Sequence, residues 1–345
     1  MTRTQAGRTR SQGFSLVELM VALVLGLLLI AAVSSLFLSS KASYRTNQSL
    51  GEVQDNSRVV FELLARDIRQ AGLTGCGNNG RVANVVNNGP NAGGAVDWWA
   101  DFSNAVHGYD GNQADPAVTT GTAARQRVAG TSSLQLMGAG PTNLSVAGPP
   151  NGATAANFHT NEPATGLLNE GDIIIICDPD HAAITQITNP VVGSSPRIDH
   201  NTGTGTPGNC SKGLGFPTDC SSANGNSYIF GPNSLIATLQ SIDWYVGNNP
   251  LGGRSLYRVA LVNNAGTATA TAQEMVRNIT DLQVSYHVTG GTGFVTAATV
   301  GGNWATVDAL QMNVTFIGTD RRASTASQSI TRQLSTTITL RNRTN

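Results

Sequence analysis

One long apolar run near the amino terminus constrains this chain more than any other feature. Residues 14–38 read FSLVELMVALVLGLLLIAAVSSLFL and contain a single formal charge, Glu18. At about 1.5 Å of rise per residue, a helix of this length covers about 37 Å, more than the roughly 30 Å of a bilayer hydrocarbon core. The run therefore predicts a helix that can span a membrane.

The residues in front of this run predict its orientation. Residues 1–13, MTRTQAGRTRSQG, contain three arginines and no acid, which favours a cytoplasmic amino terminus and places the remainder of the chain outside. Lys41 and Arg45 on the far side weaken this bias without reversing it. A secretory signal peptide has its small-residue cleavage site after the apolar run, whereas Gly13 comes immediately before it.

Glu18 is the one acid inside the apolar run. A carboxylate near the centre of a bilayer costs roughly 2.5–3.5 kcal/mol, so an acid in such a segment suggests a function with a buried cation as its partner. The alternative, favoured by the residues alone, is that Glu18 lies near the interface and reaches water. Cleavage between Gly13 and Phe14 would create a new amine one helical turn before Glu18.

The segment GFSLVELMVALVLGLLLIA resembles the class III signal of type IV pilins and type II secretion pseudopilins. The resemblance rests on glycine before the junction, phenylalanine after it, and an acid at the fifth position of the product. It implies that a prepilin peptidase cleaves after Gly13 and N-methylates Phe14. It further implies that Glu18 pairs with the terminal amine of a neighbouring subunit and sets the register of assembly.

Residues 39–72 predict an amphipathic continuation of the membrane helix. Apolar or small residues recur at alternating three- and four-residue steps, and charged residues occupy the opposite face. Gly72 is a natural helix stop, and Gly51 is a point where the helix can bend. The pattern lasts only about three heptads, which favours packing on a sheet over an intermolecular coiled coil. The stripe consists of Leu50, Val53, Ser57, Val60, Leu64, Ile68 and Ala71.

Residues 73–345 predict a β-rich periplasmic domain, so the expected fold class is α+β, with a long helix packed on antiparallel sheet. Only 12% of the residues are charged, and many segments alternate between apolar and polar residues. Two stretches rich in Gly, Asn and Pro, 74–131 and 189–225, predict long loops. The expected strands are 132–138, 172–178, 182–188, 226–231, 234–247, 254–262, 279–288, 310–320 and 334–343.

Two adjacent tryptophans lie in the first of these loop regions. Trp98 and Trp99 are either an anchor for a partner protein or, in the favoured interpretation, a pair of which one packs inward and fixes the loop.

Four cysteines form an even set in a chain whose bulk is expected outside the cytoplasm, which predicts disulfides. Three pairings are possible. Cys210 and Cys220 flank a short loop and are the favoured local pair, which leaves Cys76 for Cys177. A zinc site is disfavoured because the cysteines show neither a CxxC spacing nor an adjacent histidine.

The sequence contains no recognisable catalytic motif, and we expect no enzyme activity, no cofactor and no metal. GxSxG, HExxH, P-loop and dinucleotide-binding patterns are all absent. The five histidines are scattered, which favours solvated or structural roles. Two pairs of aspartates offer oxygen ligands for calcium but do not match an EF-hand, so roles in turns are favoured. These residues are His107, His159, His181, His200 and His287, and Asp110, Asp115, Asp178 and Asp180.

The carboxyl-terminal segments VRNITDLQVSYHV, LQMNVTFIGTD and LSTTITLRNR resemble PilW-type minor pilins. The resemblance implies a single-pass inner-membrane protein that later enters a type IV pilus. The domain is larger than that expected of a major pilin and is difficult to repeat along the shaft, which favours a position at the tip. It implies roles in priming assembly, twitching motility and adhesion. The implied partners are other minor pilins, the major pilin, the platform protein, the prepilin peptidase and a tip adhesin.

Two alternatives remain from the sequence. One is a J-type pseudopilin of type II secretion, and the other is a membrane-tethered periplasmic binding protein or enzyme. Removal of the three leader arginines leaves 18 basic residues against 21 acidic ones, and no basic run contains interleaved aromatics. Nucleic acid is therefore not an expected partner.

Overall fold

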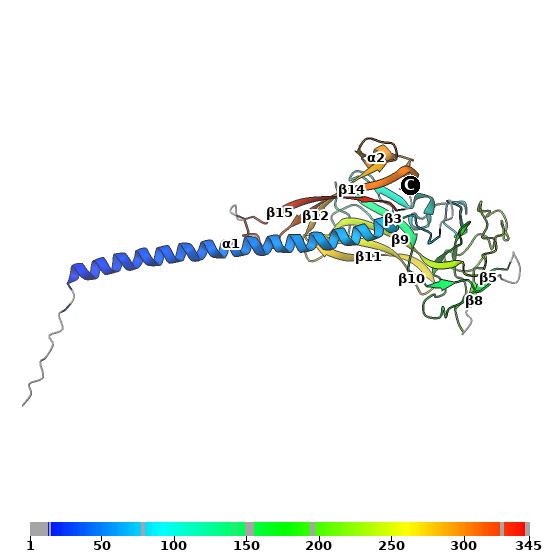
Figure 1. The fold of residues 1–345 in the computed structure, drawn as a ribbon, viewed down its shortest axis with the longest axis horizontal. Helices are drawn as coiled ribbons and strands as arrows, with labels where there is room; N and C mark the ends of the chain where they lie inside the picture. The colour runs from blue at the N-terminus through cyan, green and yellow to red at the C-terminus, as the bar shows by residue number, and fades with distance from the viewer. Residues whose placement is uncertain are drawn as a thin grey trace, which may run out of the picture. The chain divides into compact units, whose positions relative to one another are not determined.

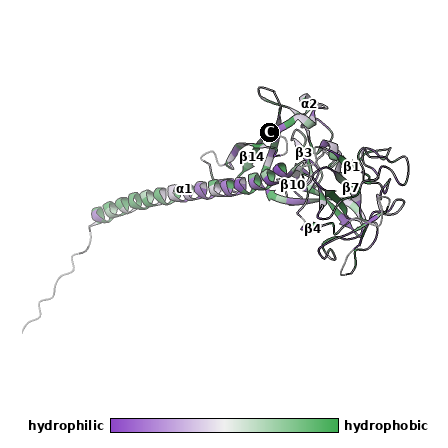
Figure 2. Ribbon diagram, turned by 45° about the vertical axis from the view of Figure 1, so that its right-hand side comes forward, coloured by the Kyte–Doolittle hydropathy of each residue, from purple (hydrophilic) through white to green (hydrophobic). Residues whose placement is uncertain are grey.

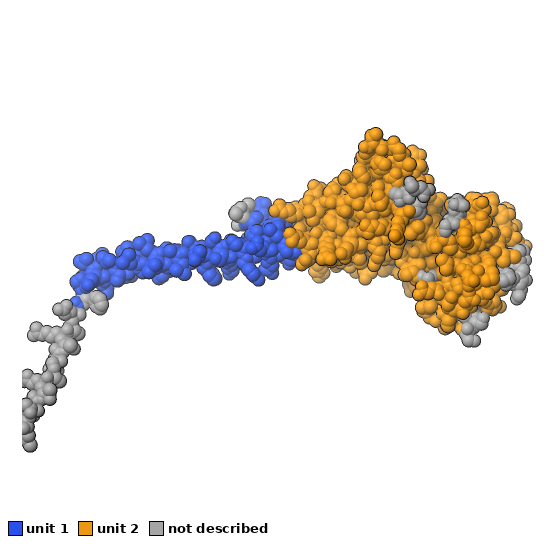
Figure 3. Space-filling view, viewed as in Figure 1, with its two compact units in different colours: residues 1–52, 318–330 blue, residues 53–317, 331–345 orange. Residues whose placement is uncertain are grey.

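The computed structural model describes residues 13, 15–76, 80–141, 143–148, 155–193, 197–324 and 328–341. The chain divides into two compact units (Figure 3). The first comprises residues 1–52 and 318–330, and the second comprises residues 53–317 and 331–345. One long helix, α1 (Leu16–Gln70), contributes to both units (Figure 1). It is helical throughout, including at Gly51.

In the first unit, the loop that begins at Gly318 contacts α1. The carboxylate of Glu52 accepts a hydrogen bond from Thr319 Oγ1 at 2.7 Å. Arg45 Nε lies 3.7 Å from Asp320 Oδ2. A Cβ atom at position 318 would clash with Ser49 Oγ, so any other residue there would require the Ser49 side chain to move.

The strands belong to the second unit and form three sheets among the described residues. Their bounds are β1 (Val82–Asn84), β2 (Val106–Tyr109), β3 (Ser133–Ala139), β4 (Leu144–Ser145), β5 (Asn157–His159), β6 (Ile173–Cys177), β7 (Ala182–Gln186), β8 (Arg197–Asp199), β9 (Leu235–Asn248), β10 (Arg254–Asn264), β11 (Thr267–Arg277), β12 (Ile279–Val288), β13 (Phe294–Val295), β14 (Val307–Ile317) and β15 (Thr331–Thr339). Four short helical segments accompany them: η1 (Trp98–Ala100), η2 (Phe102–Asn104), α2 (Ala297–Val300) and η3 (Trp304–Thr306).

The largest sheet has the strand order β1-β7-β6-β9-β10-β11. Two further strands, β3 and β4, also pair with β9, and β2 pairs with β3. The second sheet has the order β13-β12-β14-β15, and the third pairs β5 with β8. Apart from β1 with β7, the named strands pair antiparallel. The long strand β9 is shared, because its first half pairs with β6 and its second half with β3 and β10.

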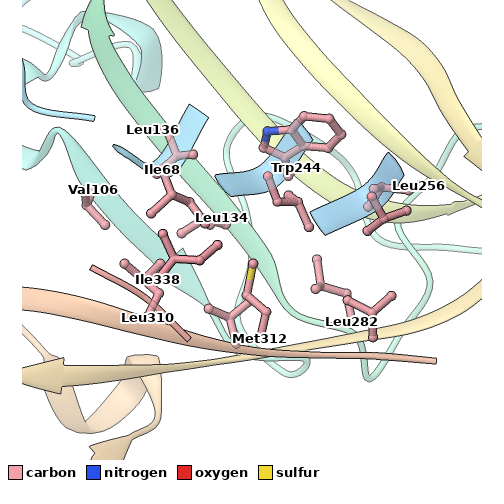
Figure 4. Close-up of a cluster of buried hydrophobic side chains, with 14 of the residues drawn as sticks. Ile68, Val106, Leu134, Leu136, Trp244, Leu256, Leu282, Leu310, Met312 and Ile338 are labelled. Carbon is pink, nitrogen blue, oxygen red and sulfur yellow. The ribbon is translucent and has the colours of Figure 1, made fainter. Parts of the chain in front are cut away.

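The main core joins α1 to the two larger sheets. Val60, Leu64 and Ile68 are fully buried, as the sequence pattern predicts, and they belong to one cluster with side chains from β3, β9, β12 and β14. Figure 4 shows Ile68 beside Leu134 and Leu136 in this cluster. Burying an apolar side chain of this size contributes about 1.5–3 kcal/mol, so this part of the helix is held by its own domain. The predicted α+β fold is confirmed.

Most of the expected strands are present, and one is wrong. One long strand, β11, was not predicted, nor were the short strands β1, β2, β4, β5, β8 and β13. The strand expected at 226–231 is wrong: Tyr228 and Phe230 lie in an irregular segment, where their rings pack against His181 at 4.1 and 5.8 Å. The omitted long strand, β11, is rich in Thr and Ala and has its large apolar residues, Met275 and Val276, only near its end. It forms because Ala265 and Gly266 both take positive φ in a two-residue turn that pairs β11 with β10.

The two regions expected as long loops contain short elements between irregular segments. The first, 74–131, contains β1, η1, η2 and β2, and the second, 189–225, contains β8. Trp99 is 7% exposed and belongs to a buried cluster with Phe102. One tryptophan of the pair therefore packs inward.

Candidate functional site

The amino-terminal end of α1 is the candidate site. Gly13 is exposed, Phe14 lies outside the described residues, and the helix begins at Leu16. Ser15 is the residue before the helix: its Oγ accepts the amide hydrogen of Glu18 at 3.1 Å, and its own amide donates to Glu18 Oε2 at 3.3 Å. This reciprocal pair is a capping box, which satisfies backbone groups that the first helical turn leaves unpaired.

The first part of α1 exposes its apolar side chains to the surroundings of the chain. Leu16, Leu29 and Phe37 are 75%, 67% and 65% exposed, and large apolar residues between them show similar values. In Figure 2 the ribbon of this part of the helix has mostly the colour of hydrophobic residues. Within the described part of the chain, α1 is the one helix long and apolar enough to cross a membrane, with a mean hydropathy of 2.8 in its most apolar window.

The geometry around Glu18 suits the binding of a cation and not proton transfer within the chain. Its carboxylate hydrogen-bonds only to the amide of Ser15 among the described contacts, and it lies in the first turn, where the helix dipole favours negative charge. The carboxylate is exposed and keeps acceptor capacity for a second partner. An ammonium group brought to this end of the helix would complete its hydrogen bonding.

A second acid on α1 is buried, and the sequence analysis missed it. Asp67 is 4% exposed, and its Oδ2 accepts hydrogen bonds from Trp244 Nε1 and from Arg258 Nε, both at 3.1 Å. These contacts tie α1 to β9 and β10. The one signal in the sequence was the position of Asp67 directly before Ile68, a member of the apolar stripe.

The structure contains two disulfides, and their pairing is the one that the spacing favoured. Cys76 bonds to Cys177 at the end of β6, and Cys210 bonds to Cys220. The first closes a loop of about a hundred residues and fixes the segment that follows α1 to the large sheet. On the chain-entropy model, closing such a loop stabilises the fold by about 4–5 kcal/mol.

The sequence analysis also missed a buried charged network in the second unit, residues 53–317 and 331–345, which we call the head. Arg127 is fully buried and donates from Nε to the carbonyl of Thr131 at 3.0 Å and from Nη1 to Ser133 Oγ at 3.1 Å. Asp115 accepts from Ser133 and Gln135. Burial, together with the neighbouring charge of Asp115, raises the pKa of Asp243 well above its usual range, which favours the neutral form of this side chain.

The remaining aspartates that could have bound calcium have structural partners. The Asp110 carboxylate accepts the amide hydrogens of Ala297 and Ala298 at the start of α2, at 3.1 and 2.8 Å. Asp178 accepts from Tyr228 Oη and from the amide of Asp180. Across the described ranges, no group of three or more His, Cys, Asp or Glu side chains is placed to hold a metal ion.

The histidines lie in different environments and do not form a cluster. His181 and His200 are buried, so of the two expected kinds of role, solvated or structural, theirs is structural. Burial lowers the pKa of His200 to about 4, so this side chain is neutral at neutral pH. His287 Nδ1 lies 2.6 Å from Asp308 Oδ1, and this hydrogen bond raises its pKa. His159 is in β5. His107 is in β2, where its ring centre lies 4.4 Å from that of Trp304, with the two rings tilted.

The comparisons with known proteins concern the same amino-terminal segment. Residues 8–34 match the prokaryotic N-terminal methylation motif. The matched residues include part of the basic leader, the Gly13–Phe14 junction and Glu18. A search of curated proteins and a search of solved structures found no match. The motif supports a type IV pilin-like prepilin, of either the pilin or the pseudopilin kind, with pilus-assembly proteins as its general partners.

Proposed function

We propose that this chain is a PilW-like minor pilin that primes type IV pilus assembly and enters the pilus near its tip. The observation that carries the proposal is the methylation motif at residues 8–34, placed on a helix whose first part exposes its apolar side chains. Such a helix has two favourable environments, the inner membrane and the apolar core of a helical filament. Assembly is then an exchange of lipid for neighbouring helices.

In this proposal, the capping box is the state of Glu18 before assembly. The carboxylate contacts the amide of Ser15 in its own chain, and cleavage after Gly13 gives each subunit an amine on Phe14. A neighbouring subunit's amine replaces or joins the Ser15 contact. Because an unpaired carboxylate in an apolar environment is unfavourable, subunits shift until acid and amine meet.

The head supports a position at the tip. It holds residues 53–317 and 331–345 as one compact unit with three sheets among its described residues, and its disulfides suit a periplasmic location. A domain of this size is difficult to repeat along a closely packed shaft. We therefore place it with the other minor pilins, the platform protein and a tip adhesin, and expect effects on twitching motility and adhesion.

Processing is tested by mass spectrometry of the chain purified from its membrane. We expect a mature protein that begins at Phe14 and carries one additional methyl group. A chain that keeps residues 1–13 in cells with active prepilin peptidase contradicts the proposal.

Assembly is tested by comparing Glu18→Ala with Asp55→Ala, which removes an exposed acid from the second part of α1. We expect Glu18→Ala to be processed but lost from sheared pili, and Asp55→Ala to enter them normally. Normal incorporation of Glu18→Ala removes the registry argument. Recovery of the wild-type chain with secretion components and never with pili would instead favour the J-type pseudopilin.

A further inference from the structure

A groove in the second unit lies between one flank of α1 and strand β15. It has a volume of about 580 Å³ and is lined by α1 residues between Arg58 and Gln70 and by β15 residues from Thr336 to Ile338. Leu73, after the helix, and Arg341, beyond the strand, complete the lining. Both walls belong to the same compact unit. Neither the methylation motif nor the assembly role of Glu18 involves this surface.

One wall of the groove is an unprotected sheet edge. β15 is the last strand in the order β13-β12-β14-β15, so its second edge has no strand partner among the described residues. It pairs with β14 through nine consecutive residues without a register shift, and residues 333–339 contain no charge and no proline. Proteins usually shorten, charge or bulge such edges to prevent pairing with other chains. The opposite edge of the same sheet, β13, has only two residues.

The groove carries an excess of positive charge, most of it on the α1 wall. Four arginines line the groove against one acid, Glu62, whose carboxylate lies 3.3 Å from Arg58. Arg66 lies 3.4 Å from Asp67, but Asp67 is already paired with Arg258. Arg69 and Arg341, the remaining two, have no acidic side chain within 4.0 Å among the described residues.

The floor between these walls is partly apolar. Phe61 and Ala65 on α1 are half-buried, and Ile338 on β15 is 3% exposed. An apolar floor, an open strand edge and a cationic rim together fit an extended peptide whose backbone pairs with the edge and whose acidic side chains meet the arginines.

We propose that the α1–β15 groove binds an extended acidic segment of a partner protein, which adds to the four-stranded sheet beside β15. Backbone hydrogen bonds to β15 supply binding that tolerates many sequences, and Arg66, Arg69 and Arg341 select for acidic ones. The inference stands on the groove alone and does not depend on entry of the chain into a pilus.

The test uses the full-length chain in detergent micelles and two labelled eight-residue peptides. One alternates Glu and Val, and the other alternates Lys and Val, so that both form strands and differ only in charge. We expect the acidic peptide to bind, with affinity that falls as salt is raised, and to slow amide hydrogen exchange at residues 333–339. We expect no binding of the basic peptide.

A matched pair of variants separates the groove from general electrostatics. The double variant Arg69→Glu with Arg341→Glu should weaken binding of the acidic peptide by at least about tenfold, which corresponds to about 1.4 kcal/mol. Arg321→Glu with Arg322→Glu makes the same change in net charge on an exposed loop outside the groove and should leave binding unchanged. Circular dichroism checks that both variants fold.

Three results would overturn the proposal. The first is no binding of the acidic peptide by the folded wild-type chain. The second is equal binding by the two double variants, or binding without protection of β15. The third is tighter binding of a single-stranded oligonucleotide than of the acidic peptide through the same arginines, which would assign the groove to nucleic acid.

Discussion

The two parts of α1 are one continuous helix, yet they meet opposite conditions. Between Leu16 and Tyr44 the large apolar side chains are exposed, whereas Val60, Leu64 and Ile68 in the second part are fully buried. The acids differ in the same way, because Glu18 is exposed at a helix cap and Asp67 is buried between two donors. Burial by the chain's own domain therefore fixes the second part, and the first part is available to a membrane or to other subunits.

The largest effect is expected for a substitution in the second part of α1. It tests whether only this part of the helix stabilises the head. Leu64→Ala should lower the free energy of unfolding by about 2–5 kcal/mol, because it leaves a cavity in the main core. Leu28→Ala, at a side chain 61% exposed, should leave the stability of the head unchanged. The measurement is denaturant unfolding in detergent micelles, followed by tryptophan fluorescence. Similar losses for both variants would contradict the comparison.

The buried acid gives the next largest effect. Asp67→Ala should lower the free energy of unfolding by about 3 kcal/mol, because Trp244 Nε1 and Arg258 lose their common acceptor inside the domain. Asp67→Asn keeps an acceptor oxygen and should lose less. Asp55→Ala on the exposed face should change stability by no more than about 0.5 kcal/mol. An Asp67→Ala protein as stable as Asp55→Ala would show that the buried contacts do not hold the helix.

The sequence predicted this division of α1 because periodicity reports burial directly. A long run of mostly apolar residues with one charge indicated the apolar part, and three- and four-residue spacing indicated the face that packs on the sheets. The same reasoning found most strands with large alternating residues. It failed at β11, where strand formation depends on a turn at Ala265 and Gly266 and on pairing with β10. It also failed at 226–231, where aromatic rings are buried without strand pairing.

The candidate site was predictable only in part, for a similar reason. The Gly13–Phe14 junction and Glu18 are local in the sequence, so a motif identifies them. The partners of Asp67 come from strands far along the chain, and a single sequence does not show which residues meet. The partners of Arg127 are near it in the sequence, but no periodic pattern marked Arg127 as buried. The α1–β15 groove likewise depends on which strand lies at the edge of its sheet, and a single sequence does not show that order.

Lowering the pH should reduce the stability of the head more than that of the apolar part of α1, because the head contains a buried histidine. Burial lowers the pKa of His200 to about 4 from an ordinary 6.5, so its stabilising contribution is complete above pH 6.5 and is lost as the pH falls toward 4. The loss should reach about 2 kcal/mol at pH 5.

The measurement for this effect is the free energy of unfolding at pH 7 and pH 5 for the wild-type chain and for His200→Asn. The variant removes the titrating group, so its stability should fall by about 2 kcal/mol less over this range. The difference between the two pH slopes, and not the absolute stability, is the relevant quantity. Identical slopes would show that protonation of His200 does not contribute.

The smallest expected effect lies at the start of the helix, where the capping box of Ser15 and Glu18 is the only described side-chain support. Ser15→Ala should weaken the first turn by about 1 kcal/mol, because the amide of Glu18 loses its acceptor. Amide hydrogen exchange in micelles should therefore become about fivefold faster at Glu18. Ser34→Ala, inside the same apolar part, should leave this exchange unchanged. Since the head is fixed by burial elsewhere, its unfolding should not respond to Ser15→Ala, and a coupled loss would mean that the two parts of α1 do not act separately.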